Sequence, residues 1–202
     1  MTDTKYRYFI INKPYNMVSQ FVSTHNVGLL GDLAYDFPEG THAIGRLDNN
    51  SEGLLILTTN KKVTKLLFSS VVAHKRTYLV QVKKEVSPES LHKLQTGVSI
   101  FVKGAVDYIT TPCEVAIVTK PANLFELPEE KIIYGQHTWL LITLTEGKFH
   151  QVRKMVDAVG HRCTRLIRIS IEDLLLGDLQ PGCIQELEEA DFFKKLRIAD
   201  WK

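Results

Sequence analysis

The sequence predicts an α+β fold, and three observations support this class. Short apolar or alternating runs, which are typical of strands, occur at residues 7–11, 54–58 and 75–83. Apolar residues at helical spacing, flanked by residues that favour helix ends, occur between and after these runs. A chain of 202 residues can bury roughly two thirds of its unfolded surface, so a substantial core is expected.

The first third of the chain is expected to alternate strand and helix. The run "RYFII" predicts a strand that ends at a turn containing Pro14 and Asn16. Four apolar residues at helical spacing then predict a helix before the stop signal "PEG": Leu29, Leu30, Leu33 and Phe37. After Gly53, "LLILT" predicts a short buried strand. Asn60 can then cap a helix with three apolar residues on one face: Val63, Leu66 and Leu67.

The middle third begins with an alternating strand and a helix with clear end signals. In "KRTYLVQVK", Tyr78 shares a strand face with Val80 and Val82, because side chains alternate along a strand. Three residues mark the ends of a predicted helix over residues 88–96: Ser87 as cap, Pro88 at the first position and Gly97 after the last turn. Three further strand-like segments follow, at residues 98–102, 113–119 and 138–145. Residues 120–137 contain prolines and acids and are expected to form a long loop.

The last third is expected to hold a helix, a strand and a closing helix. Apolar residues recur at i, i+3, i+4 and i+7 in an amphipathic helix predicted over residues 149–159 and ended by Gly160: Val152, Met155, Val156 and Val159. The alternating segment "RLIRISI" predicts a strand. Over residues 185–196 acids precede bases, an order that suits the macrodipole of a closing helix.

Composition narrows the class of protein. The formal net charge of +2 is mild, so the distribution of charge is more informative than its sum. The cysteines Cys113, Cys163 and Cys183 are odd in number and widely spaced, which favours neither a disulfide framework nor a zinc site. No apolar run approaches the roughly 20 residues of a membrane span, and the N-terminus has no apolar signal core. A cytoplasmic protein without membrane association is expected.

The first candidate for chemistry is the segment "GRLD". If it is extended, Arg46 and Asp48 lie on the same side, and an arginine beside a carboxylate favours its ionised form. Taken alone, the segment favours the simpler interpretation that Asp48 begins the turn "DNNSEG", as aspartate often does. A calcium loop that starts at Asp48 would need a bidentate Glu where the chain has Thr59. A glycosidase pair of Asp48 and Glu52 requires a separation that sequence alone does not supply.

The second candidate is a basic segment. Residues 144–170 hold six Lys or Arg against two acids, whereas residues 171–202 hold eight acids and four bases. Such a stripe is typical of a phosphate-binding face, and equally of an ordinary solvated helix face. His150 and Arg153 are expected on one face of the helix over residues 149–159. His150 has no partner at ligand spacing, so no metal site is predicted.

Together these segments resemble a known family. The motifs "INKPYNMVS", "GRLDNNSEGLLILT", "KRTYLV", "EGKFHQVRKM" and "TRLIRISI" resemble, in order, those of the pseudouridine synthases, in the branch that modifies single uridines of ribosomal RNA. The family often has Gly where this chain has Asn16, which can still form a left-handed turn. The resemblance implies a mixed, mostly antiparallel sheet flanked by helices, with an active cleft across the sheet. It also implies one catalytic domain over residues 1–202, without an N-terminal RNA-binding domain of the S4 type.

The resemblance assigns roles to individual residues. Asp48 falls on the catalytic aspartate, Tyr78 on the tyrosine that lies against the target base, and Arg153 on the basic residue that pairs with the aspartate. Arg46 matches an arginine that helps to hold the target nucleotide out of the helix. Four cations would contact the RNA backbone: Lys148, Lys154, Arg165 and Arg168. Leu166 is either a plain core residue or an apolar contact of the base.

The implied activity is site-specific isomerisation of uridine to pseudouridine in 23S ribosomal RNA, without metal or organic cofactor. The expected partner is ribosomal RNA or an assembling large subunit, bound by a monomer. Two alternatives stay open: the same chemistry on 16S ribosomal RNA or transfer RNA, and an RNA-binding assembly factor that has lost activity.

Overall fold

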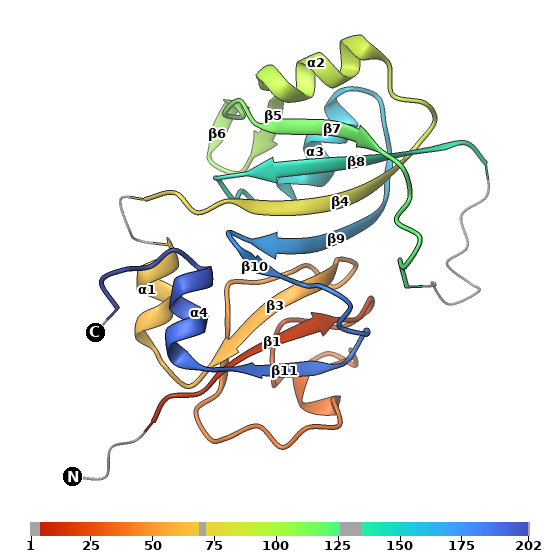
Figure 1. The fold of residues 1–202 in the computed structure, drawn as a ribbon. Coiled ribbons are helices and arrows are strands. Elements are labelled where there is room, and N and C mark those ends of the chain that lie inside the picture. The colour runs from red at the N-terminus through yellow and green to blue at the C-terminus, as the bar shows by residue number, and fades with distance from the viewer. Residues whose placement is uncertain (1–4, 69–71, 126–134, 202) are drawn as a thin grey trace. The chain divides into compact units, whose positions relative to one another are not determined.

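The computed structural model describes residues 5–68, 72–125 and 135–201. The chain forms two compact units, which are treated separately (Figure 1). The first unit comprises Met1–His74 and Arg168–Lys202, and the second comprises Lys75–Ile167. None of the helices in the described segments is long and apolar enough to cross a membrane.

The first unit is built on an antiparallel sheet in which strand β1 (Tyr8–Lys13) lies between β3 (Glu52–Thr58) and β11 (Ile184–Leu187) (Figure 1). The short strand β2 (His42–Ile44) pairs antiparallel with β3. Every residue of β1 and β3 is buried, as expected for apolar runs without alternation.

Two helices complete the first unit. Helix α1 (Lys62–Phe68) begins after Asn60, whose side-chain oxygen accepts a hydrogen bond from the backbone N–H of Lys62 at 3.0 Å. This confirms the predicted cap. Helix α4 (Glu189–Lys195) buries Phe192 and Phe193, whose ring centroids lie 4.6 and 5.4 Å from that of Tyr8 on β1.

The helix predicted around residues 29–37 is wrong. The structure has only a single 3-10 turn, η1 (Leu30–Asp32), in this region. The local backbone hydrogen bonds here are those of short turns, such as Leu33 N–H to the Leu30 carbonyl at 3.4 Å, and the N–H of Leu30 donates to the carbonyl of Gln20 at 2.9 Å. Aromatic packing also competes with helix formation: the rings of Tyr35 and Phe37 lie 5.6 and 5.8 Å from that of Phe9. Tertiary contacts therefore override the local spacing.

The second unit contains three antiparallel strands in the order β4 (Arg76–Lys83), β8 (His137–Leu144) and β7 (Glu114–Val118). A hairpin of β5 (Ser99–Val102) and β6 (Ala105–Ile109) forms a separate two-stranded sheet. Strand β6 was not predicted. The strands expected at residues 98–102, 113–119 and 138–145 are confirmed within one residue at each end.

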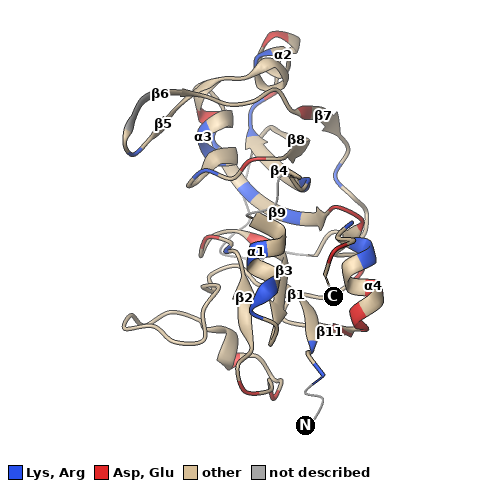
Figure 2. Ribbon diagram, turned by 90° about the vertical axis from the view of Figure 1, so that its left-hand side faces the viewer, with Lys and Arg blue, Asp and Glu red and all other residues tan. Residues whose placement is uncertain are grey.

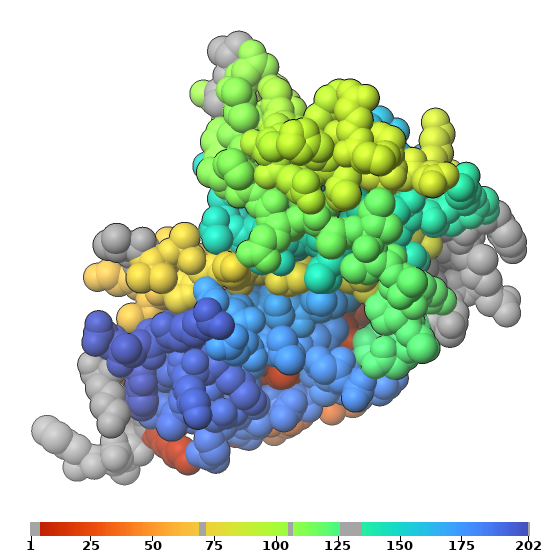
Figure 3. Space-filling view, turned by 45° about the horizontal axis from the view of Figure 1, so that its top comes forward, coloured from red at the N-terminus to blue at the C-terminus, as the bar shows by residue number. Residues whose placement is uncertain are grey.

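Two helices belong to the second unit, α2 (Pro88–Thr96) and α3 (Gln151–Ala158). Helix α2 has the predicted ends, because the Ser87 side chain accepts a hydrogen bond from the N–H of Ser90. It lies on the surface of the unit, where its yellow-green atoms are visible in Figure 3. Helix α3 begins at Gln151 rather than 149, because His150 adopts a left-handed conformation with φ 55° and ψ 29°. The expectation that His150 shares a helix face with Arg153 is therefore wrong.

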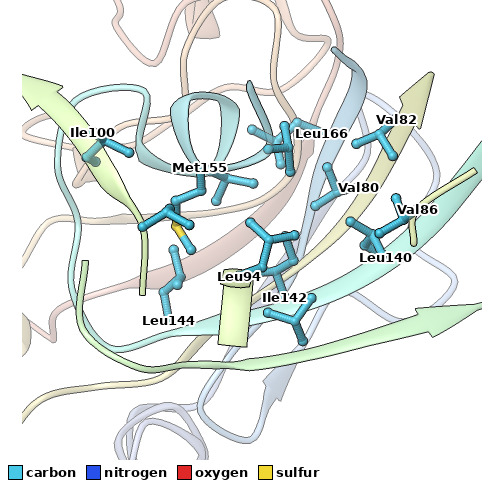
Figure 4. Close-up of a cluster of buried hydrophobic side chains, with 14 residues drawn as sticks. Val80, Val82, Val86, Leu94, Ile100, Leu140, Ile142, Leu144, Met155 and Leu166 are labelled. Carbon is cyan, nitrogen blue, oxygen red and sulfur yellow. The ribbon is translucent and has the colours of Figure 1, made fainter. Parts of the chain in front are cut away.

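The core of the second unit joins its strands to both helices. The cluster includes Val80 and Val82 from β4, Leu140 and Ile142 from β8, Leu94 from α2 and Met155 from α3 (Figure 4). Burying each such side chain stabilises the fold by about 1.5–3 kcal/mol relative to exposure. The core thereby fixes α3, whose polar side carries basic residues.

The remaining elements are strands β9 and β10, the start of the closing helix and the predicted loop. Strand β9 (Cys163–Ile171) begins in the second unit and ends in the first, where β10 (Leu174–Leu175) pairs with its end. The closing helix starts at Glu189, not at 185, because the preceding residues form β11 and pair with β1. Of the predicted loop over 120–137, residues 120–125 form neither helix nor strand, and residues 126–134 lie outside the described residues.

Candidate active site

In the first unit, Asp48 lies in a loop that connects β2 to β3. Leu47 is buried, its N–H donates to Ser19 Oγ at 3.0 Å, and Ser19 Oγ donates to the carbonyl of Leu47 at 2.9 Å. Because this anchor faces inward, the neighbouring Arg46 is exposed and Asp48 is half-buried. The N–H of Ser51 donates to the Asp48 carbonyl at 3.0 Å, so Asp48 does begin a tight turn.

That turn leads directly into strand β3, and this geometry argues against a calcium-binding loop at Asp48. In a calcium loop, positions five to eleven would have to curve around the ion, but here Glu52–Thr58 are a buried strand paired with β1. The structure therefore agrees with the sequence argument from Thr59 against a calcium loop. Within the described residues, no three His, Cys, Asp or Glu side chains are grouped so as to hold a metal ion.

A buried lysine lies near Asp48, and sequence reasoning missed it. Lys13 is 0% exposed and donates hydrogen bonds from Nζ to the carbonyls of Met17 at 2.6 Å and Pro14 at 2.9 Å. Burial lowers the pKa of Lys13 to about 8, while the carboxylates of Glu52 and Asp48 act in the opposite direction. The sequence feature that could have pointed to Lys13 is its place in the "NKP" of the first motif.

Arg168 belongs to the same charged cluster. It is 5% exposed, its Nε donates to the Leu54 carbonyl at 2.8 Å, and its positive charge lowers the pKa of Lys13 further. The first unit therefore gathers two buried cations around the segment that carries Asp48 and Glu52.

In the second unit, Tyr78 and Arg153 are each held by packing. Tyr78 is half-buried against the core cluster, as the predicted strand face requires. Arg153 lies on the polar side of α3, and its Nη1 is 3.5 Å from the sulfur of Cys163. Burial raises the pKa of the Cys163 thiol to about 11, and the Arg153 charge opposes this shift. Leu166 is 5% exposed and belongs to the same core cluster.

The four predicted phosphate contacts differ in exposure. Figure 2 shows basic segments on α3 and β9. Lys148 is exposed and Lys154 is half-buried, whereas Arg165 is 5% exposed and its Nη1 donates to the Phe125 carbonyl at 2.9 Å. The two lysines are therefore better placed than the two arginines, Arg165 and Arg168, for contact with RNA.

The loop that carries Lys148 is fixed by Glu146, which sequence reasoning also missed. Glu146 accepts hydrogen bonds from the hydroxyl of Tyr108, from the N–H of Thr111 at 3.1 Å and from Nε2 of Gln151. The bond to Glu146 raises the pKa of Tyr108. These partners come from the end of β6, the segment after it and α3. Glu146, the first residue of the "EGKFHQVRKM" motif, therefore holds the loop to three neighbouring segments.

The first unit holds a half-buried carboxylate near buried cations, and the second unit carries one exposed and one half-buried lysine. These features suit an enzyme that acts on an anionic substrate. Residues 7–158 match the RNA pseudouridylate synthase family, and the chain belongs to this family of isomerases. The resemblance drawn from the motifs is thereby confirmed.

Individual relatives agree with this assignment. The ribosomal large subunit pseudouridine synthase E of Vibrio parahaemolyticus is 36% identical over 180 residues, which cover 89% of this chain and 73% of that protein. The enzyme of the same name from Xanthomonas axonopodis pv. citri is 33% identical over 176 residues, covering 85% and 89%. A crystal structure of a pseudouridylate synthase matches with a TM-score of 0.73 and 25% identity, over 95% of this chain and 74% of that one. The predicted α+β class with a mostly antiparallel sheet is confirmed.

Proposed function

We propose that this enzyme converts one specific uridine of 23S ribosomal RNA to pseudouridine, with Asp48 as the catalytic carboxylate. The observation that carries the proposal is the similarity to the two enzymes named ribosomal large subunit pseudouridine synthase E, over 85–89% of this chain. The enzyme acts as a monomer on ribosomal RNA or on an assembling large subunit.

The reaction breaks the bond from C1′ to N1 of uracil and forms a bond from C1′ to C5. N1 gains a proton and C5 loses one to solvent. Asp48 begins the reaction at the ribose, either by attack on C1′ or by removing a sugar proton. Its position supports this role, because the anchored Leu47 holds the turn and the buried charge of Lys13 lies close by.

The remaining residues bind and orient the nucleotide. The half-buried ring of Tyr78 lies against the uracil, and Arg153 serves as the basic residue that the motif resemblance assigns to it. Exposed Arg46 replaces lost stacking when the uridine is turned out of the helix, a step that costs a few kcal/mol. Lys148 and Lys154 contact the RNA backbone, whereas the buried Arg165 and Arg168 add positive charge without reaching the surface, and Leu166 packs in the core.

The proposal is tested with 23S ribosomal RNA carrying tritium at C5 of uridine, because isomerisation must release that tritium to water. We expect release by the native protein and none above background by Asp48→Asn. Asp36→Asn is the matched control, since Asp36 is an exposed aspartate of the same unit, and it should release tritium at the native rate. Undiminished release by Asp48→Asn would refute the role of Asp48.

The same assay separates the alternatives. Tritium release from 16S ribosomal RNA or transfer RNA, but not from 23S ribosomal RNA, would support the isomerisation chemistry and refute 23S ribosomal RNA as the substrate. Binding to ribosomal RNA without release from any of the three would favour an inactive assembly factor.

Arg153 needs a control for its neighbour. Arg153→Gln should abolish release, whereas Cys163→Ser removes only the sulfur beside it and should keep most of the native rate. If the two variants lose activity equally, the packing around Cys163 rather than the Arg153 charge is what matters.

A further inference from the structure

The strongest unassigned feature is an exposed pair of stacked rings in the second unit. Phe149 is 71% exposed, and its ring is stacked on that of His150, with centroids 3.8 Å apart and planes inclined by 18°. A single exposed aromatic residue needs no explanation. Here, however, the residue beside it holds a left-handed backbone conformation, φ 55° and ψ 29°, which costs energy for a residue other than glycine.

The loop under these rings is fixed before any ligand arrives. Glu146 binds donors from three segments, as described above. On the other side, Arg76 Nη2 donates to the carbonyl of Thr145 at 2.8 Å. A Cβ added to Gly147 would lie only 3.1 Å from Arg76 Nη1, so the glycine permits this close approach. The stacked rings therefore stand on a rigid base, and a ligand would pay little entropy to order them.

One ammonium group lies over the Phe149 ring, and a second lysine precedes Phe149 in the sequence. Lys154 Nζ lies 5.4 Å from the centroid of the Phe149 ring and donates to the Phe101 carbonyl at 2.8 Å. Lys148 Nζ lies 4.7 Å from the centroid of Tyr108, whose hydroxyl is bonded to Glu146. The Glu146 carboxylate thus already accepts hydrogen bonds from three donors. The positive charges of Lys148 and Lys154 are therefore not taken up by this carboxylate.

We infer that Phe149 and His150, with Lys148 and Lys154, form a nucleotide-stacking site for an unpaired base of the RNA substrate close to the target uridine. An exposed aromatic ring with a lysine ammonium group 5.4 Å from its centroid has the chemistry of single-strand binding surfaces, where bases stack on aromatic residues and phosphates contact lysines. The site adjoins the proposed catalytic residues of its own unit. His150 directly precedes α3, which carries Arg153, and Arg76 lies two residues before Tyr78 on β4.

This inference rests on the proposed function for the identity of the RNA, but its first test does not. The probe is a short single-stranded oligouridylate with one 2-aminopurine, whose fluorescence is quenched when the base stacks on a ring. The native protein should bind it with quenching. Phe149→Ala should weaken binding by roughly 5- to 100-fold and abolish most of the quenching, while Phe149→Trp restores both. Ile117→Ala is the control, because Ile117 is a half-exposed apolar residue of the same unit and should behave as the native protein.

Equal binding and quenching in native protein and Phe149→Ala would overturn the inference, and would mark the rings as a surface for a protein partner instead. Lys148→Gln should lower the salt dependence of binding by about one phosphate contact, and an unchanged salt dependence would remove Lys148 from the site. In the tritium assay on 23S ribosomal RNA, Phe149→Ala should raise KM with little change in kcat. Absence of release by the native protein would refute the proposed function while leaving the oligonucleotide result valid.

Discussion

The buried Lys13 allows a quantitative prediction about stability and pH. Burial lowers its pKa from 10.5 to about 8 in the folded protein, whereas the unfolded chain keeps the ordinary value. Below pH 8 the lysine is protonated in both states, so its contribution does not vary. Between about pH 8 and 10.5 the unfolded state binds more protons than the folded state, and stability therefore rises with pH. From pH 7 to pH 10 the gain is about 2.5 kcal/mol.

The test compares the native protein with Lys13→Met by urea unfolding at several pH values from 7 to 10. The free energy of unfolding of the native protein, minus that of the variant, should rise by about 2.5 kcal/mol over this range. Other titrating groups are present in both proteins and cancel in the difference. Lys65→Met is the matched control, because Lys65 is an exposed lysine of the same unit, and its difference from the native protein should be independent of pH.

A constant difference between native protein and Lys13→Met would refute the reasoning. It would mean that the carbonyls of Met17 and Pro14, together with the nearby carboxylates, hold the ammonium charged and outweigh burial. The sign of the difference at pH 7 is not itself diagnostic. Removing the charge relieves a desolvation cost but leaves two carbonyls without a donor, and these effects oppose each other.

Three further outcomes are expected. Gly97→Ala should destabilise the protein by about 3 kcal/mol or more in urea unfolding, because φ is +114° and a Cβ there would overlap a backbone carbonyl oxygen. At Gly104 φ is +90° but the space is open. Gly104→Ala should therefore cost only about 1 kcal/mol in the same assay. A disulfide reagent at pH 8 should modify exposed Cys183 fast. The half-buried Cys113 and Cys163 should react at least about tenfold more slowly, since partial burial raises the pKa of both thiols to about 11; loss of the fast phase in Cys183→Ser checks the assignment. Binding of 23S ribosomal RNA should weaken at least about tenfold from 50 to 200 mM salt, and an affinity that does not change with salt would argue against phosphate contacts.

The parts of the fold that sequence predicted well are those set by neighbours along the chain. Helix α2 is the clearest example, since Ser87, Pro88 and Gly97 act within one turn of the ends they define. Strand β11 shows the opposite case. It pairs with β1 through contacts such as Ile11 with Ile184, and nothing local in an acidic tail indicates that pairing.

The site shows the same division. Asp48, Tyr78 and Arg153 were chosen through motifs, and the structure gives each a defined setting within its unit, although their roles stay predictions. Glu146 was missed because its partner Tyr108 is 38 residues away and comes from β6, which was not predicted. Lys13 was missed because a lysine at the end of a strand is ordinarily exposed, and only the fold shows that it is buried.

Two features that cost stability lie beside residues proposed to handle the substrate. Lys13 is buried near Asp48, and His150 holds a left-handed backbone next to the exposed ring of Phe149. Local exceptions to folding rules are expected where a protein works on its substrate. If that holds here, Lys13→Met should slow tritium release even under conditions in which the variant remains folded. Phe149→Ala should weaken RNA binding without lowering the free energy of unfolding.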